Sequence, residues 1–473
     1  KVDYDEYDKC ASDMAITCDA AYFWHITDFH VDPHYDNWVN DLWNSCNQDV
    51  SQTQGEMGDF ECDSPWQLVE SSIKAMQEFG RDPEFILWTG DSPPHAKDYE
   101  WVDQAVVLEI IQNITNLIKG AFAPDIPVVV SLGNHDFYPR NQLPGHNNEI
   151  YDAVYEMWKP WMDSDEMKKT FTKGGYYTTM LSDSPKVRVI VANTNLYYSV
   201  NEAVTGEEDP GDQFKWMEEL LGQARDNGEK VHLVTHVPPG VLKTDEGKGE
   251  TWFTEEYNTK FNDIVRRYGD VILAIYSGHK HLDTFTLYYD EDGNPVAYML
   301  VAPSVTPWRT RLGSDLESNA HNPAVRKILL DRDTYELMDV QQYYLDLSTY
   351  KDNNMDTAKW TKLYSYSDKY DLEKLSPAGL HSVAEEFKEQ ESEKFQDYQE
   401  LNTVKTNHDS NVPCDCECKN LHLCSIQKVD YDEYDKCASD MAITCGAGLI
   451  RSGIYIYIVG VTFLVWLMQV FDA

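Results

Sequence analysis

The chain has 473 residues, of which 42% are hydrophobic, so it can bury one large core with appendages or two separate cores. Its 81 acidic and 39 basic residues give a formal net charge of -42 at pH 7. A surface with this charge repels phosphate backbones, which argues against general binding of nucleic acids.

An 18-residue segment opens the chain and returns near its end. KVDYDEYDKCASDMAITC occupies residues 1–18 and, without a change, residues 428–445. One short copy at each end is not the pattern of a structural repeat array. We therefore interpret residues 1–20 as a separate N-terminal segment, duplicated or artefactual, with no catalytic role.

Strand-like runs alternate with amphipathic helices between residue 21 and about residue 345. SPWQLVESSIKAMQEFG predicts a helix over 64–80, with Ser64 as N-cap, Pro65 in the first turn and Gly80 as stop. Residues 98–120 and 211–228 repeat the helical pattern. Runs rich in β-branched and aromatic residues predict strands at 21–27, 84–89, 126–132, 186–194, 230–235 and 271–277. This alternation predicts an α/β core.

A side chain that can bind a metal follows five of these strands. The carboxyl ends of strands in α/β sheets meet at one crevice, so these side chains should lie together there. Carboxylate, imidazole and amide ligands favour zinc, manganese or iron over calcium or magnesium. Two such ions bridged by one carboxylate would support hydrolysis of a phosphate ester. In chain order the residues are Asp28 and His30, Asp91, Asn134 and His135, His236, and His279 and His281.

From about residue 346 the strand pattern ends, and polar helix-forming stretches such as 379–398 take over. We expect a helical C-terminal subdomain over 346–445. The ten cysteines fall between Cys10 and Cys62 or between Cys414 and Cys445, which favours disulfides near the two ends. A zinc ribbon at CDCECKNLHLC is the alternative. With the one glycosylation sequon, at Asn113, the cysteines indicate an oxidising compartment.

The segment 446–473 contains an apolar stretch of 18 residues, IYIYIVGVTFLVWLMQVF, interrupted only by Thr462 and Gln469. This length can span a membrane. A tail that is removed for a glycolipid anchor is the other interpretation, and Gly446-Ala447-Gly448 would supply its small residues.

Taken together, the motifs resemble a known family. Asp28-Phe29-His30, Gly90-Asp91, Gly133-Asn134-His135-Asp136, His236 and Gly278-His279-Lys280-His281 stand in the order and approximate spacing of the calcineurin-like metallophosphoesterases. The stretches GEMGDFECDSPW, TGDSPPH, THVPPG and VAPSVTPW further resemble the acid sphingomyelinase-like phosphodiesterases, over about residues 20 to 445.

This resemblance implies a four-layer αββα sandwich over residues 21–345 with two zinc ions. One ion would be held by Asp28, His30 and His281, the other by Asn134, His236 and His279, with Asp91 bridging them. His95 and His135 would lie toward the scissile phosphate and the leaving group, and their motifs show no carboxylate partner for either ring.

The resemblance also implies disulfides Cys46–Cys62, Cys414–Cys418 and Cys424–Cys437, which places the downstream copy of the repeat in the fold. Cys10 and Cys18 are then left to pair locally, and Cys416 and Cys445 have no assigned partner.

The expected function is a secreted or surface-anchored zinc phosphodiesterase that acts on soluble nucleotide or choline-phosphate compounds. The expected location is outside the cell or in the lysosome, with membrane contact through the C-terminal tail. One alternative is a sphingomyelin phosphodiesterase that releases phosphocholine; it is disfavoured because the 20 residues before Ala21 cannot form the saposin-like domain of such enzymes. The other is a catalytically silent surface binding or regulatory protein, which a complete ligand set argues against.

Overall fold

The computed structural model describes residues 21–35, 55–95, 101–243, 249–309, 311–312, 316–317, 320–348, 358–389, 391–405, 414–441 and 445. The predictions for residues 1–20, for Cys46 and for the tail 446–473 lie outside these ranges. Within them, no helix combines the length and the apolar character that crossing a bilayer requires.

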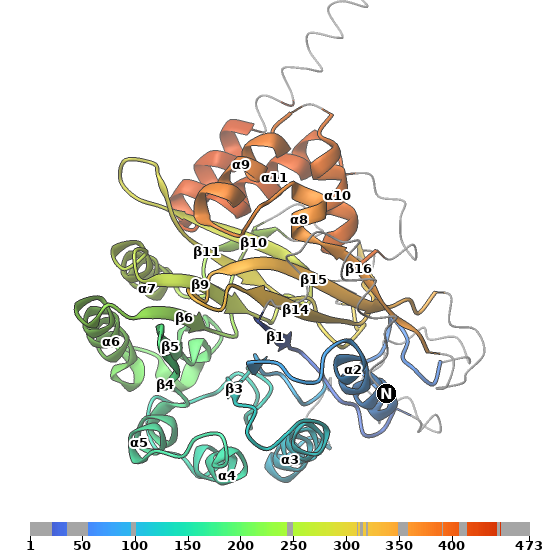
Figure 1. Cartoon of the computed structure of the whole chain (residues 1–473), viewed down its shortest axis with the longest axis vertical. Coiled ribbons are helices and arrows are strands. Elements are labelled where there is room, and N and C mark those ends of the chain that lie inside the picture. The colour runs from blue at the N-terminus through green and yellow to red at the C-terminus, as the bar shows by residue number, and fades with distance from the viewer. Residues whose placement is uncertain are drawn as a thin grey trace, which may run out of the picture.

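Two six-stranded sheets form the centre of the molecule (Figure 1). In the first sheet β1, β2 and β3 are parallel, and β14 to β16 continue the sheet in antiparallel pairs. Its spatial order is β16 (Trp360–Ser365), β15 (Leu337–Leu345), β14 (Ala324–Leu330), β1 (Ala21–Ile26), β2 (Phe85–Trp88) and β3 (Val128–Val130).

The second sheet has a parallel centre with an antiparallel strand at each edge. Its order is β10 (Thr284–Tyr289), β11 (Pro295–Val301), β9 (Ile272–Ser277), β6 (Lys230–Val234), β5 (Lys186–Val191) and β4 (Tyr177–Asp183). Two small hairpins pair β7 (Val241–Lys243) with β8 (Gly249–Thr251) and β12 (Arg311–Leu312) with β13 (Leu316–Glu317). All six predicted strands are present.

The inner faces of the two sheets pack on each other. The Phe23 ring of β1 lies 5.6 Å from the Tyr276 ring of β9, and both side chains are buried. Successive side chains of a strand point to opposite faces, so Trp24 points outward, where its indole N–H donates to the carbonyl of Gly80 at the end of the first described helix. The two sheets thus form the middle layers of a sandwich.

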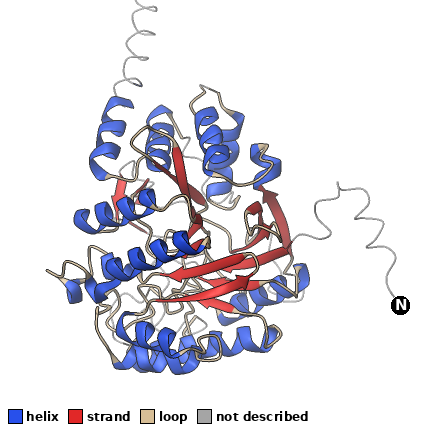
Figure 2. Ribbon diagram, turned by 60° about the vertical axis from the view of Figure 1, so that its left-hand side comes forward, coloured by secondary structure: helices blue, strands red, loops and turns tan. Residues whose placement is uncertain are grey.

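Helices cover both outer faces of the sandwich (Figure 2). Helices α6 and α7 pack on the second sheet and α2 on the first, which confirms the four-layer αββα arrangement. The bounds are α2 (Trp66–Phe79), α3 (Gln104–Ala121), α4 (Glu149–Trp158), α5 (Asp165–Gly174), α6 (Gln213–Asn227) and α7 (Glu255–Arg267). Three short 3-10 helices are η1 (Thr194–Tyr197), η2 (Glu202–Val204) and η3 (Pro210–Asp212).

Ser64 does not cap α2, contrary to the prediction. Pro65 is the N-cap residue, and no side chain caps this helix end. The Ser64 amide donates instead to the carbonyl of His30, and the Ser64 carbonyl accepts from the amide of Asp32. The residue is therefore used to tie the segment before α2 to the loop that follows β1.

Helices that follow the last described strand gather at one end of the molecule, at the top of Figure 1. They include α8 (Tyr366–Tyr370), α9 (Pro377–Phe387), α10 (Glu393–Asn402) and α11 (Cys416–Gln427). The prediction that strands end near residue 346 is wrong, because β16 pairs with β15 at the edge of the first sheet. The alternating pattern of WTKLYS is too short to separate this edge strand from a loop.

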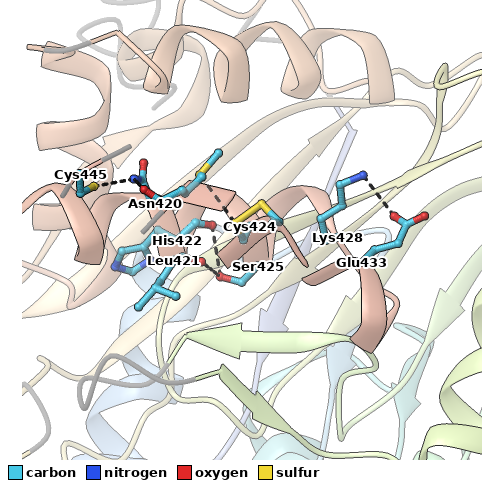
Figure 3. The surroundings of a disulfide bond; sticks show 10 residues. Asn420, Leu421, His422, Cys424, Ser425, Lys428, Glu433 and Cys445 are labelled. Atoms are coloured by element: carbon cyan, nitrogen blue, oxygen red, sulfur yellow. Dashed lines mark hydrogen bonds and ion pairs between the residues drawn. A yellow bond between two sulfur atoms is a disulfide. The ribbon is translucent and has the colours of Figure 1, made fainter. Parts of the chain in front are cut away.

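Three disulfides lie within residues 414–445, in α11 and the segments that flank it. Cys414–Cys418 and Cys424–Cys437 are both present as predicted, and Cys416 pairs with Cys445, which had no assigned partner. The pairs use all six sulfur atoms of this region, so the zinc-ribbon alternative is wrong. Near Cys424, the Asn420 amide also reaches the Cys445 sulfur (Figure 3). Cys62 is disulfide-bonded as well.

The downstream copy of the repeat is an integral part of the fold. The carbonyl of Val429 accepts from the side-chain amides of Asn258 and Asn262 on α7, at 2.8 and 3.1 Å. Asp430 forms an ion pair with Arg266 of the same helix. The buried backbone of this segment is thus paired by α7.

We expect Asn258→Ala to lower the free energy of unfolding by about 1–3 kcal/mol, because its amide satisfies two backbone groups at a buried position. Asn258 accepts from the amide of Gly240 at 2.8 Å and donates to Val429. Denaturant unfolding measures the change. Thr259→Ala, at the exposed neighbouring position, is the control; equal losses in the two variants would contradict the prediction.

Candidate metal centre and active site

The loops that follow β1, β2, β3, β6 and β9 meet at one end of the two sheets. Parallel strands in both sheets run toward this end, so a side chain just past each strand points into the same space. The structure brings together all nine polar residues that the sequence analysis selected there. They are Asp28, His30, Asp91, His95, Asn134, His135, His236, His279 and His281.

One group consists of Asp28, His30 and His281, whose potential ligand atoms all lie within 4.8 Å of one another. Nε2 of His281 is 3.4 Å from Oδ1 of Asp28 and 3.2 Å from Nε2 of His30. All three side chains are buried, so these polar atoms have no solvent to satisfy them. The group has the atoms and the spacing of a cation site.

A second group consists of Asp91, His236 and His279, again within 4.8 Å. Nε2 of His236 lies 3.1 Å from Oδ2 of Asp91 and 3.1 Å from Oδ1 of Asn134. Nε2 of His279 is buried without a hydrogen-bond partner. A buried nitrogen without a hydrogen-bond partner can coordinate a cation through its lone pair.

Asp91 connects the two groups. Its Oδ2 atom is 3.4 Å from Nε2 of His30 and 3.1 Å from Nε2 of His236. Its other oxygen accepts from the amide of His135 at 2.8 Å. One carboxylate oxygen therefore faces both groups.

Backbone and amide groups fix how the ligands are turned. Nδ1 of His30 donates to the carbonyl of Pro93 at 2.8 Å, and Nδ1 of His236 donates to that of Thr89 at 2.6 Å. Each ring then presents an unprotonated Nε2 when neutral. The Asn134 amide donates to Asn141, so its oxygen is the atom that faces His236.

The loops hold their ligands in unusual backbone conformations. A left-handed backbone costs energy at non-glycine residues and persists only where the surroundings enforce it. Five of the grouped residues have positive φ angles: Asp28 (51°), His30 (40°), Asp91 (59°), His279 (70°) and His281 (64°). Such clustering is typical of a functional site.

Close packing of the loops explains two glycines of the motifs. A Cβ atom on Gly133 would lie 2.0 Å from Oδ1 of Asp91, and one on Gly278 would lie 2.6 Å from Oδ2 of Asp28. Both contacts are far below van der Waals distance. Only glycine lets these turns approach the carboxylates.

Asp136 supports the site from behind, a role that the sequence analysis missed although the residue belongs to the GNHD motif. Its carboxylate accepts from the amides of Asp91, Ser92 and Gly133, each at 2.8 Å. Burial, with the nearby charge of Asp91, raises the pKa of Asp136 to about 6. The carboxylate thereby ties the loops after β2 and β3 to each other.

The electrostatics of the centre call for positive charge. Burial opposes protonation of His30, but its hydrogen bond to Asp28 and the charge of Asp91 raise its pKa to about 9. Burial likewise opposes protonation of His236, while the charge of Asp91 and its hydrogen bond raise that pKa to about 9. Protons thus balance the carboxylates unless another cation does. The donor set of carboxylates, imidazoles and one amide fits two divalent metal ions.

His95 has a carboxylate partner, contrary to the sequence-based expectation. Its Nδ1 donates to Oδ1 of Asp63 at 2.8 Å, and its backbone amide donates to Oδ2 at 2.6 Å. Asp63 lies 32 positions earlier, in the GEMGDFECDSPW stretch. The imidazole also stacks on Trp308, with ring centres 3.9 Å apart. Both contacts fix its orientation.

His95 and His135 lie beside the two groups, with their ring centres 3.9 and 4.9 Å from that of His30. Nδ1 of His135 donates to the carbonyl of Pro94. Burial lowers the pKa of both rings well below the usual value, and a charge on His30 lowers it further, while the charge of Asp91 opposes the shift. Among the described residues, the His135 ring makes no hydrogen bond to a carboxylate.

A small recess has His135 in its wall. Its walls are mostly apolar and aromatic, and one cation, Arg140, lies among them. The charge of Arg140 acts on both His95 and His135, where it lowers the pKa. The lining residues are Pro93, Pro94, Val102, His135, Phe137, Tyr138 and Arg140.

Asn113 lies away from this centre. It is exposed in the middle of α3, while Thr115 of the same sequon is buried and accepts from the Trp158 indole at 3.0 Å. The asparagine side chain therefore faces solvent.

Two family models match the chain. The model for calcineurin-like phosphoesterases matches residues 21–283, and the model for the acid sphingomyelin phosphodiesterase C-terminal region matches residues 294–444. The first match includes every residue of the two groups and both neighbouring histidines. The second includes helices α8 to α11.

Curated relatives align over most of their own lengths. The chain is 40% identical over 419 residues to acid sphingomyelinase-like phosphodiesterase 3b of Homo sapiens, which covers 88% of this chain and 89% of that protein. It is 37% identical over 424 residues to cyclic GMP-AMP phosphodiesterase SMPDL3A of Homo sapiens, covering 89% and 90%. The chain is therefore a calcineurin-like phosphoesterase and belongs to the acid sphingomyelinase-like phosphodiesterases.

Proposed function

We propose that this phosphodiesterase binds two zinc ions and hydrolyses phosphodiester or phosphoanhydride bonds in soluble nucleotide or choline-phosphate compounds. The observation that carries the proposal is Oδ2 of Asp91, which faces His30 and His236 at 3.4 and 3.1 Å. Asp91 would bridge the ions. Asp28, His30 and His281 would hold the first ion, and Asn134, His236 and His279 the second.

When bound, the two ions would act as Lewis acids that lower the pKa of a water molecule and neutralise phosphoryl oxygens. The protein's own side chains would position the substrate and protonate the leaving group. His95 and His135 stand next to the first ligand group, where they would donate a proton or hydrogen bond to the leaving oxygen as its bond to phosphorus breaks. Because Asp63 accepts the Nδ1 proton, Nε2 of His95 is the nitrogen that would exchange a proton with substrate.

Arg140 supports an anionic leaving group. Its charge acts on both histidines, and Arg140 lines the same recess as His135. Guanidinium groups bind phosphate oxygens well, and nucleotide substrates carry further phosphates beside the bond that breaks. A relative's name, cyclic GMP-AMP phosphodiesterase, also points to a nucleotide substrate. A ceramide leaving group would not use this charge.

For localisation, we propose a secreted protein or one anchored at the outer cell surface through residues 446–473, with the lysosome as the other compartment. The three C-terminal disulfides support an oxidising environment. The exposed position of Asn113 is compatible with glycosylation.

Turnover measurements distinguish the proposed phosphodiesterase from a sphingomyelin hydrolase and from a catalytically silent binding protein. Purified protein should release phosphate or phosphocholine from ATP or CDP-choline faster than phosphocholine from sphingomyelin. Faster release from sphingomyelin would establish the lipid hydrolase instead. Failure to cleave a generic aryl phosphodiester with both ions bound would indicate a silent binding protein.

Metal binding to chelator-treated protein at pH 7 should release about two protons per chain. His30 and His236, with pKa values raised to about 9, carry protons at this pH, and each must lose its proton to coordinate through Nε2. Metal affinity should therefore rise with pH and level off above about pH 9. Calorimetric titration in buffers with different ionisation enthalpies measures the protons. Binding without proton release would contradict the ligand assignment.

His95→Gln should reduce turnover about 10²- to 10⁴-fold for a poor leaving group, the range of one general acid, and much less for nitrophenolate, which leaves unaided. Asp63→Asn should show the same dependence on the leaving group with a smaller loss of turnover, because this substitution only misplaces the His95 ring. Steady-state kinetics with matched alkyl and nitrophenyl diesters tests both variants. Equal losses with the two esters would mean that His95 positions substrate without donating a proton.

Arg140→Ala should lower kcat/KM for ATP by roughly 10- to 100-fold, the value of one charge-assisted hydrogen bond. A nitrophenyl nucleotide ester, whose leaving group has no further phosphate, should be affected much less. Arg140→Lys keeps the charge and should retain part of the activity toward ATP. Equal effects on both substrates would rule out a contact between Arg140 and the leaving group.

A further inference from the structure

The loop that carries His279 and His281 needs support from outside itself. It joins β9 to β10, and both histidines have left-handed backbones, with φ angles of 70° and 64°. Its first half is tied to the centre, because the His279 amide donates to both oxygens of Asp28 at 3.1 and 3.0 Å. Its second half, where His281 lies, leads away from the centre toward Asp283.

Asn402 grips this second half by two hydrogen bonds in opposite directions. Its side-chain amide donates to the carbonyl of Asp283 at 2.7 Å, and its own carbonyl accepts from the amide of Asp283 at 2.9 Å. Asn402 is the last residue of α10, where carbonyl groups have no partner inside the helix. The helix end is therefore free to accept a bond from the loop.

The surroundings of Asp283 make this grip rigid. Its buried carboxylate pairs with Arg326 of β14 at 2.6 Å and accepts from the hydroxyl of Tyr366 at 2.8 Å. The next residue, Thr284, shares a hydrogen bond with Tyr398, also on α10. Tyr366 and Asn402 belong to α8 and α10, which lie in the C-terminal family region and not in the phosphoesterase region.

The turn after α10 holds a second loop at the same place. The Asn322 amide donates to the carbonyls of Val404 and Lys405, at 3.0 and 3.3 Å. The adjacent His321 ring lies 5.8 Å from that of His281. The end of α10 thus touches both segments that flank His281.

We propose that Asn402 is a positioning residue for His281, through which the C-terminal helices set the affinity of the first metal position. The inference rests on the proposed two-metal function. Residues that orient a ligand at one remove change metal affinity about 10- to 100-fold when they are replaced. Among the described residues, Asn134, His236 and His279 of the second position make no hydrogen bond to Asn402.

The test is stepwise removal of zinc from the full chain with a chelator, followed by elemental analysis. Asn402→Asp keeps the size of the side chain but replaces the amide that donates to the Asp283 carbonyl with a carboxylate oxygen. Asn402→Ala removes the amide without adding charge. Both should lose one ion at about tenfold lower chelator concentration than the wild type, while the other ion is released as in the wild type. His281→Ala identifies which step belongs to the first position.

Thr403→Ala is the matched control, since its hydroxyl reaches only the Glu400 carbonyl of its own helix, at 3.5 Å. It should bind both ions like the wild type. The second ion serves as an internal control for folding, because general destabilisation would weaken both positions. Unchanged affinity for both ions, or equal weakening of both, in the two Asn402 variants would overturn the inference. A wild-type chain that binds one ion or none would instead refute the proposed function.

Discussion

The burial of Asp28 and Asp91 is the constraint on which the rest of the structure depends. Both carboxylates are almost completely inaccessible to solvent, and a buried charge without compensation is strongly destabilising. The compensating imidazoles come from three different strand ends, so the two sheets must face each other with their parallel strands pointing the same way. The four-layer sandwich is the arrangement that satisfies this requirement.

The same constraint explains the strain in the loops. Ligands can converge within hydrogen-bonding distance only if the chain turns sharply after each strand, which places several of them in left-handed backbones. The energy must come from elsewhere in the fold. Asp136 supplies part of the support by accepting hydrogen bonds from three backbone amides, and Gly133 and Gly278 leave room for the loops to approach the carboxylates.

The two family regions act as one structure. Residues 21–283 carry the ligand groups, yet the last ligand loop is held by helices from the region 294–444. The downstream repeat copy, in the region 428–445, is likewise paired with α7 of the phosphoesterase region. The helices therefore do more than cover the second sheet, because they reach the backbone next to His281.

The amino-acid sequence alone determined the strands of the core and the residues that form the ligand groups. Runs of β-branched and aromatic residues predicted six strands. The polar residues that follow five of these strands predicted which side chains would meet, because the carboxyl ends of parallel strands lie at the same edge of a sheet. Cysteine spacing, compared with the family, identified two of the three C-terminal disulfides. Contacts between segments that are far apart in the sequence were decided only by the tertiary structure. The pairing of Asp63 with His95, of Cys416 with Cys445, and of Asn402 with Asp283 depends on how whole elements pack, and no pattern within either segment records the position of the other.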